Sequence, residues 1–154
     1  MTLALARAQV KTVVETVSAI GIVHDYERFA NEATSADEWF YAQGQVNFAI
    51  IRANSLGSTV LTCGEQERVT EFEIEWFLSV QDERASRKTA ETGVESLKDA
   101  LIAARTLGGT VANCTGPISE KIDNRMLHIG DRKELVHRML VRFQAEERVA
   151  VTYA

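Results

Sequence analysis

The longest alternation of apolar and polar residues in the chain predicts a β-strand over residues 69–80. The apolar side chains recur at every second position: Phe72, Ile74, Trp76, Leu78 and Val80. Successive side chains of a strand point to opposite faces, so the glutamates between them, Glu71, Glu73 and Glu75, form an acidic face. A register shift of one residue would bury three carboxylates, and the pairing of this strand is therefore strongly specified.

Two other segments have the three- and four-residue apolar spacing of amphipathic helices. The first covers residues 3–20, and Gly21 follows it directly. The second covers residues 82–107, and the pair Gly108-Gly109 follows that one. Glycine is favoured just past the end of a helix, so both ends agree with the spacing.

Shorter patterns predict the remaining elements. Between the two helices we expect an extended segment at 22–29, a short helix at 36–43, and strands at 46–53 and 59–63, with turns at 54–58 and 64–67. After the second helix we expect strands at 110–113, 118–127 and 135–143, the last resuming over 149–153. The strand at 135–143 has an apolar face and a cationic face that carries Arg138 and Arg142.

Helix, strands, helix and strands in this order predict an α+β fold. Short turns between neighbouring strands favour a largely antiparallel or mixed β-sheet, with the two long helices packed on one face. The length of 154 residues is that of one domain, spanning residues 1–154.

Composition narrows the classes of function. A hydrophobic content of 45% with 25% charged residues is typical of a soluble globular protein. The net charge of −5 lacks the basic surplus of a sequence-specific nucleic-acid binder. The start of the chain becomes polar too early for a signal peptide, and no apolar run is long enough to span a membrane. Cys63 and Cys114 belong to no paired motif, so we expect two free thiols.

Motifs for catalysis or cofactor binding are not found in the sequence. His24, His128 and His137 are isolated from one another and from both cysteines, so we expect no zinc site and no other cofactor. The glycine pairs match neither a phosphate-binding loop nor a dinucleotide fingerprint, and no GxSxG turn is present. One enzymatic alternative stays open, in which His24, Tyr26 and Arg28 converge on one face of an extended segment.

The region from residue 24 to residue 52 is dense in aromatic and arginine side chains, as protein–protein interfaces are. Two interpretations apply to the charged faces: Glu71, Glu73 and Glu75 are a solvated outer surface or line a lumen that repels nucleic acid. The two arginines of strand 135–143 would face these glutamates across the sheet or across a subunit boundary. The candidate interface residues are Tyr26, Arg28, Trp39, Phe40, Arg138 and Arg142.

Several segments also suggest a family. The run Gly-Ile-Val-His-Asp-Tyr-Glu-Arg-Phe at 21–29 resembles the segment after the first helix in small neck proteins of long-tailed bacteriophages, as does Phe-Ala-Ile-Ile-Arg at 48–52. The turns at 107–111 and 116–118, and the closing strand around His137, are similar to those of the tail-terminator, or tail-completion, group. The resemblance covers most of the chain in order, through scattered positions. It departs at Phe48, where relatives often carry Trp, and in the loop 31–37.

The resemblance implies a structural virion protein without enzymatic activity. Such proteins form a ring, commonly a hexamer, that caps the tail tube and joins it to the head-side connector or stopper. The partners would be copies of the chain itself, the tail-tube protein and the connector, with DNA only passing through the lumen and no membrane involved. The expected location is the tail or neck of the virion, after assembly in the cytoplasm of the bacterial host. The alternatives are a head-side adaptor or stopper, a bacterial assembly protein unrelated to phages, and the small cytosolic enzyme above.

Overall fold

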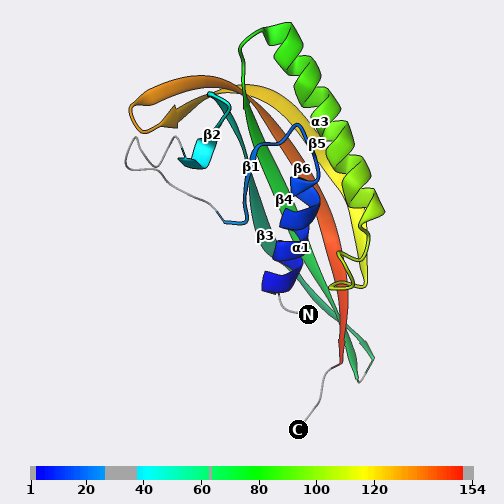
Figure 1. Ribbon diagram of the computed structural model, residues 1–154. Helices are drawn as coiled ribbons and strands as arrows, with labels where there is room; N and C mark the ends of the chain where they lie inside the picture. Colours follow the sequence, from blue (N-terminus) through cyan, green and yellow to red (C-terminus); the bar gives the residue numbers. More distant parts are fainter. Residues whose placement is uncertain (1–2, 27–37, 63, 151–154) are drawn as a thin grey trace.

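The computed structural model describes residues 3–26, 38–62 and 64–150. It contains a six-stranded sheet with two helices on one of its faces (Figure 1). The elements are α1 (Leu3–Glu15), β1 (Ile22–His24), β2 (Tyr41–Ala42), β3 (Gln45–Thr62), β4 (Glu65–Ser79), α3 (Glu83–Ala103), β5 (Asn113–Ile129) and β6 (Arg132–Ala150). The predicted α+β fold, with a mixed sheet and both long helices on one face, is confirmed.

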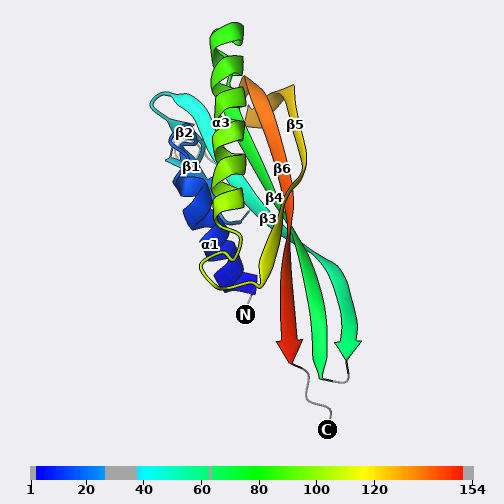
Figure 2. The ribbon, with the colours of Figure 1, turned by 90° about the vertical axis from the view of Figure 1, so that its right-hand side faces the viewer.

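The strands lie in the order β1-β3-β4-β6-β5, and β2 pairs with the start of β3. Neighbouring long strands are antiparallel, whereas β1 is parallel to β3. The sheet is therefore two long hairpins, β3–β4 and β5–β6, placed side by side through the β4–β6 ladder. The helix α3 connects these two hairpins and runs along one face of the sheet, roughly in the direction of the strands (Figure 2).

The main core lies between the sheet and the two helices. The alternation predicted for β4 is confirmed, because Phe72, Ile74 and Trp76 are all buried against the helices. At Gly93 a Cβ atom would lie 2.5 Å from the Trp76 ring, far inside van der Waals contact. The absent side chain of Gly93 is what lets α3 rest directly on this indole.

Asn47 fastens the segment after α1 to the centre of the sheet. Its Oδ1 accepts hydrogen bonds from the backbone N–H of Gly21 at 3.0 Å and from the indole N–H of Trp76 at 2.7 Å. Its Nδ2 donates to the carbonyl of Ala19 at 3.0 Å. One amide side chain thus satisfies three polar groups from two other parts of the chain.

Several predicted boundaries were wrong. The helix predicted at 3–20 ends at Glu15 and continues as turns, and the one predicted at 82–107 covers Glu83–Ala103. For the short helix predicted at 36–43, the described part of that range has a helical turn at 38–40, which β2 follows, and residues 36–37 lie outside the described residues.

The turn predicted at 54–58 is absent, because β3 runs on to Thr62. A register shift between Ser55 and Gly57 absorbs the turn-favouring residues while pairing with β4 continues. The strand predicted at 110–113 was wrong except for its last residue, because 110–112 form turns and bends and β5 begins at Asn113. The strand predicted at 118–127 is part of β5, which has a register shift between Thr115 and Ser119. Long ladders of backbone hydrogen bonds thus override the local turn signals.

Three strands extend beyond the helices, and most of this extension also lies beyond the start of β5 (Figure 2). We call this part the ribbon: residues 54–62 of β3, 65–71 of β4 and 144–150 of β6. Its strands stay paired to the tip, with two register shifts between β3 and β4, and there Glu65 lies opposite Thr62 on one side and Ala150 on the other. Near its tip, neither face of the ribbon is therefore covered by a helix.

Candidate functional site

The face of the sheet opposite the helices carries a row of alternating charges, which we call the charge row. It runs from Arg52 on β3 through Glu75 on β4 and Arg138 on β6 to Asp123 on β5. Glu75 Oε1 lies 3.1 Å from Arg52 Nη1, and Glu75 Oε2 accepts from Arg138 Nε at 2.6 Å. Arg138 Nη1 lies 3.7 Å from Asp123 Oδ2. The row therefore links four neighbouring strands by charge-assisted contacts.

A second pair lies beside the charge row. Glu73 is directly opposite Arg142 in the β4–β6 register, and Arg142 Nε lies 3.6 Å from Glu73 Oε2. The prediction that Arg138 and Arg142 face the glutamates across the sheet is confirmed within the subunit. Glu75 is only 7% exposed and is neutralised by two guanidinium groups, so in this subunit it is not the free carboxylate that a repulsive lumen needs.

Further carboxylates lie on the same face of the ribbon. Strand alternation places Glu65 and Glu67 on the face that carries Glu71, and the β4–β6 register adds Glu146. Arg148, opposite Glu67, is the cation of this face among the ribbon residues of β4 and β6. Glu65 and Glu67 were not predicted to belong to this acidic face, because the sequence pattern predicts a turn at residues 64–67. The acidic surface that Glu71 begins therefore continues toward the ribbon tip.

The other end of the helix-free face holds a smaller apolar core. Phe40, Phe48 and Phe77 form a chain of rings, with centroids 4.6 Å apart for the first pair and 4.9 Å for the second. Phe40 is 6% exposed because its ring is buried in the core of its own subunit. Its assignment to a subunit interface was therefore wrong. Trp39 is half-buried at the border of this cluster, and its interface role stays a prediction.

The proposed acid–base group of His24, Tyr26 and Arg28 is not assembled in the described residues. His24 is buried beside Phe40, and its Nε2 lies 2.7 Å from the carbonyl of Trp39. Tyr26 is exposed and instead lies under the guanidinium of Arg7 on α1, 4.2 Å from the ring centroid. Arg28 lies outside the described residues.

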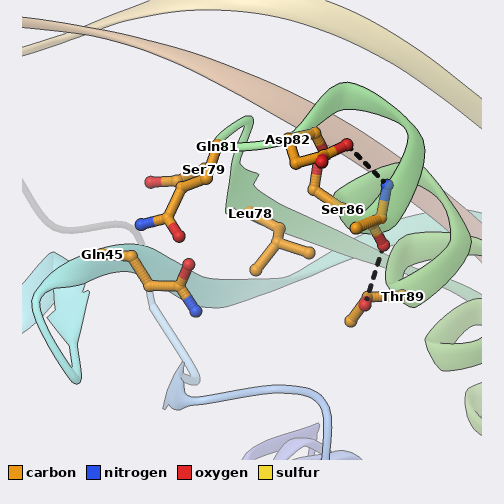
Figure 3. A pocket seen from close by; sticks show the side chains of 8 residues that line it. Gln45, Leu78, Ser79, Gln81, Asp82, Ser86 and Thr89 are labelled. Atoms are coloured by element: carbon orange, nitrogen blue, oxygen red, sulfur yellow. Dashed lines mark hydrogen bonds between the residues drawn. The ribbon is translucent and has the colours of Figure 1, made fainter.

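A shallow pocket of about 210 Å³ lies at the start of α3 (Figure 3). Its polar lining includes Gln45, Gln81 and Ser86, whose side chains come from β3, from the bend between β4 and α3, and from α3. Behind Ser86 lies the fully buried His137, with its Nε2 2.8 Å from Ser86 Oγ and its Nδ1 2.7 Å from Asn124 Oδ1. No sequence motif indicated this chain of hydrogen bonds, because its members come from three separate elements.

The order serine, histidine, asparagine is that of a nucleophile, a base and an orienting group, but the surroundings do not support catalysis. Ser86 Oγ also lies 2.7 Å from the carbonyl of Asp82, a second acceptor for its one proton. The N–H groups of Arg84 and Ala85, which could stabilise an oxyanion, both donate to the capping carboxylate of Asp82. We therefore interpret this group as a structural connection between α3 and the sheet.

This connection predicts a pH dependence of stability. Burial lowers the pKa of His137 below its ordinary value of 6.5, the nearby Arg87 lowers it further, and Glu83 partly opposes them. The unfolded chain thus binds a proton at a higher pH than the folded chain does. We expect the free energy of unfolding to fall as pH decreases below about 6.5, measured by urea denaturation. His137→Gln should flatten this part of the profile, whereas the exposed His128→Gln should leave it unchanged; an unaltered slope in the first variant would contradict the assignment.

The described residues include no group of three or more histidine, cysteine, aspartate or glutamate side chains placed to hold a metal ion. Cys114 is a buried free thiol, as predicted, and burial raises its pKa to about 11. Such a thiol is protonated at neutral pH and therefore a poor nucleophile. Cys63 lies outside the described residues.

Comparisons with known proteins give no identification. The sequence matches no protein-family model, and no curated protein matches it significantly. In the part of the chain that the structure describes, no helix is both long enough and apolar enough to cross a membrane.

Proposed function

We propose that the chain is a structural neck protein of a long-tailed bacteriophage, similar to the tail terminators. In this role it forms a ring that caps the tail tube and joins it to the head-side connector. The observation that carries the proposal is the acidic, helix-free face of the ribbon. Glu65, Glu67, Glu71 and Glu146 gather there, beside the cation Arg148.

An acidic surface of this kind suits a channel through which double-stranded DNA passes. Lumen carboxylates repel the phosphates, so DNA slides through instead of being retained. This role falls to the ribbon carboxylates rather than to Glu73 and Glu75, which are paired with arginines of the same subunit. The sheet supplies the rigid base that holds the ribbon.

A head-side adaptor or stopper is the second candidate within the same class, because the acidic face suits any neck ring that DNA crosses. The enzyme alternative is weaker: His24 and Tyr26 face different surroundings, and the Ser86 group lacks free oxyanion donors. A gene for a tail-tube protein next to the gene for this chain would favour the terminator.

The ring itself is directly testable. The expected result is a closed ring with cyclic symmetry, of about six copies as the resemblance to the tail terminators implies. Light scattering after size exclusion would give its mass, and negative-stain images would show its central opening. Both measurements should be made with the purified chain alone and after addition of tail tubes. A particle that keeps the monomer mass of 17.1 kDa in both preparations would contradict the proposal.

A matched pair of variants tests the acidic channel. Replacing Glu65 and Glu67 by lysine should leave ring formation intact but make the ring retain linear double-stranded DNA at low salt. Replacing Glu91 and Glu95 by lysine makes the same charge change on the exposed side of α3 and should not. Equal DNA retention by the two variants in a filter-binding assay would argue against a lumen on the ribbon face.

A further inference from the structure

We propose that neighbouring copies join through the ribbon, where the free edge of β3 in one copy pairs with the end of β6 in the next. This inference rests on the proposed function, because it names the two surfaces that meet in the ring. It follows from a difference between the two edges of the sheet.

The edge formed by β5 is protected against pairing with another strand. This strand contains Pro117, a register shift between Thr115 and Ser119, and the charged residues Glu120, Lys121, Asp123 and Arg125. Proline, bulges and charges are the devices by which proteins prevent edge-to-edge association. The edge of β5 is therefore a poor acceptor for a further strand.

The edge formed by β3 lacks most of these devices. From Ile51 to Thr62 it contains no proline and one charged residue, Arg52, close to its start. Two register shifts bend it against β4, but they add neither a charge nor a proline. β1 and β2 cover this edge only as far as Ile50, and no other described strand pairs with it. A long, nearly uncharged edge is the kind that accepts another strand.

Ring geometry indicates which strand it accepts. A ring needs two different patches on each subunit, so the edge of β3 must meet something other than another β3. The opposite edge of the same ribbon is β6, which continues to Ala150 although the β5–β6 ladder ends with Asn113 opposite Glu146. The ribbon thus has a long acceptor edge on one side and the last residues of β6, Arg148 to Ala150, on the other.

The strand directions are compatible with this joint. β3 and β6 are both antiparallel to β4, so they run in the same direction. A copy related by rotation about a ring axis would therefore present its β6 parallel to β3. The edge of β3 already accepts one parallel strand, β1, at residues 48–50. The neighbouring β6 would continue that arrangement farther along the same edge.

Closure of the ribbons in this way would produce a barrel. Three strands from each of six copies give about 18 strands, the size at which β-barrels enclose an aqueous channel. The helices do not obstruct this closure, because they end before the ribbon begins (Figure 2). With the helix-free face inward, the ribbon carboxylates would line the channel.

A disulfide between copies tests the joint. Thr59 and Arg148 both lie opposite Glu67, on either side of β4. Within one subunit they are two strand spacings apart, roughly 9.5 Å. That distance exceeds the Cα separation of about 7 Å that a disulfide tolerates. In a chain with Cys63 and Cys114 replaced by serine, we expect Thr59→Cys with Arg148→Cys to give a ladder of covalent oligomers on a non-reducing gel. Ser58→Cys with Arg148→Cys samples the adjacent register.

The single variants and a β5 control make the outcome specific. Covalent dimers from Thr59→Cys alone would show β3 pairing with β3 and would overturn the joint. A ladder of equal yield from Ser119→Cys with Arg148→Cys would also overturn it, because Ser119 is on the protected edge. Rings seen by negative stain without any ladder would refute the edge pairing and leave the proposed function standing. A chain that forms no rings under any condition would refute the proposed function itself.

Discussion

Replacing Asn47 by leucine should lower the free energy of unfolding by about 2–3 kcal/mol, since it removes the hydrogen-bond partner of three polar groups, and a buried group such as the Trp76 indole N–H costs about 1–3 kcal/mol when unsatisfied. The indole N–H of Trp76 and the carbonyl of Ala19 would both lose their partner, and so would the N–H of Gly21. Leucine has the same branching of heavy atoms and leaves no cavity, so the loss reports the hydrogen bonds. Chemical denaturation monitored by tryptophan fluorescence would measure it.

Asn54 provides the matched control on the same strand. It is exposed, and Asn54→Leu should change the free energy of unfolding by less than about 0.5 kcal/mol. If Asn47→Leu changes it no more than the control does, the Asn47 hydrogen bonds contribute little to stability, and α1 must be held by apolar packing alone.

The second large effect is expected at Glu75. Glu75→Ala leaves Arg52 and Arg138 facing each other without the carboxylate between them. Removing one partner from a buried ion pair costs roughly 3–5 kcal/mol, and we expect a loss near the lower limit because the arginines are partly exposed. Thermal unfolding and chemical denaturation should both show it.

Glu71→Ala removes the same group from the same strand face at a less buried position, and a loss of less than about 1 kcal/mol is expected. A comparable loss in the two variants would mean that Glu75 is no more than a surface carboxylate. The double variant Glu75→Leu with Arg138→Leu should regain part of the stability, since apolar pairs often replace buried ion pairs without cost.

The fold class follows from the sequence because its longest patterns are strong. The alternation around Phe72 and Trp76, and the helical spacing from Ala90 to Leu101, each depend on side chains that the core buries. The prediction that Arg138 and Arg142 face the glutamates of β4 came from the same alternation. These patterns depend on local periodicity, which the sheet and the helices preserve.

The errors share one physical origin, which is pairing between distant strands. Asn54, Ser55 and Gly57 favour a turn locally, but the ladder with β4 keeps them extended. Phe40 ends a helical turn that is too short for its sequence pattern to reveal a buried face, and its burial depends on Phe48 and Phe77. The Ser86–His137 connection likewise forms only when α3 lies on β6. Contacts of this kind leave no periodic signal in a single sequence.

The side-by-side arrangement of two hairpins has a consequence for how the chain folds. Each hairpin closes locally, and Gly130, with φ 58°, supplies the tight turn between β5 and β6. The β4–β6 ladder, by contrast, joins residues more than fifty positions apart, such as Ser79 and Val136 at its near end. Because loop-closure entropy opposes contacts between distant residues, we expect this union to be the slow step of folding. Until the two hairpins pair, the edges of β4 and β6 are exposed. We therefore expect newly made chains to be most prone to association with other chains before this pairing.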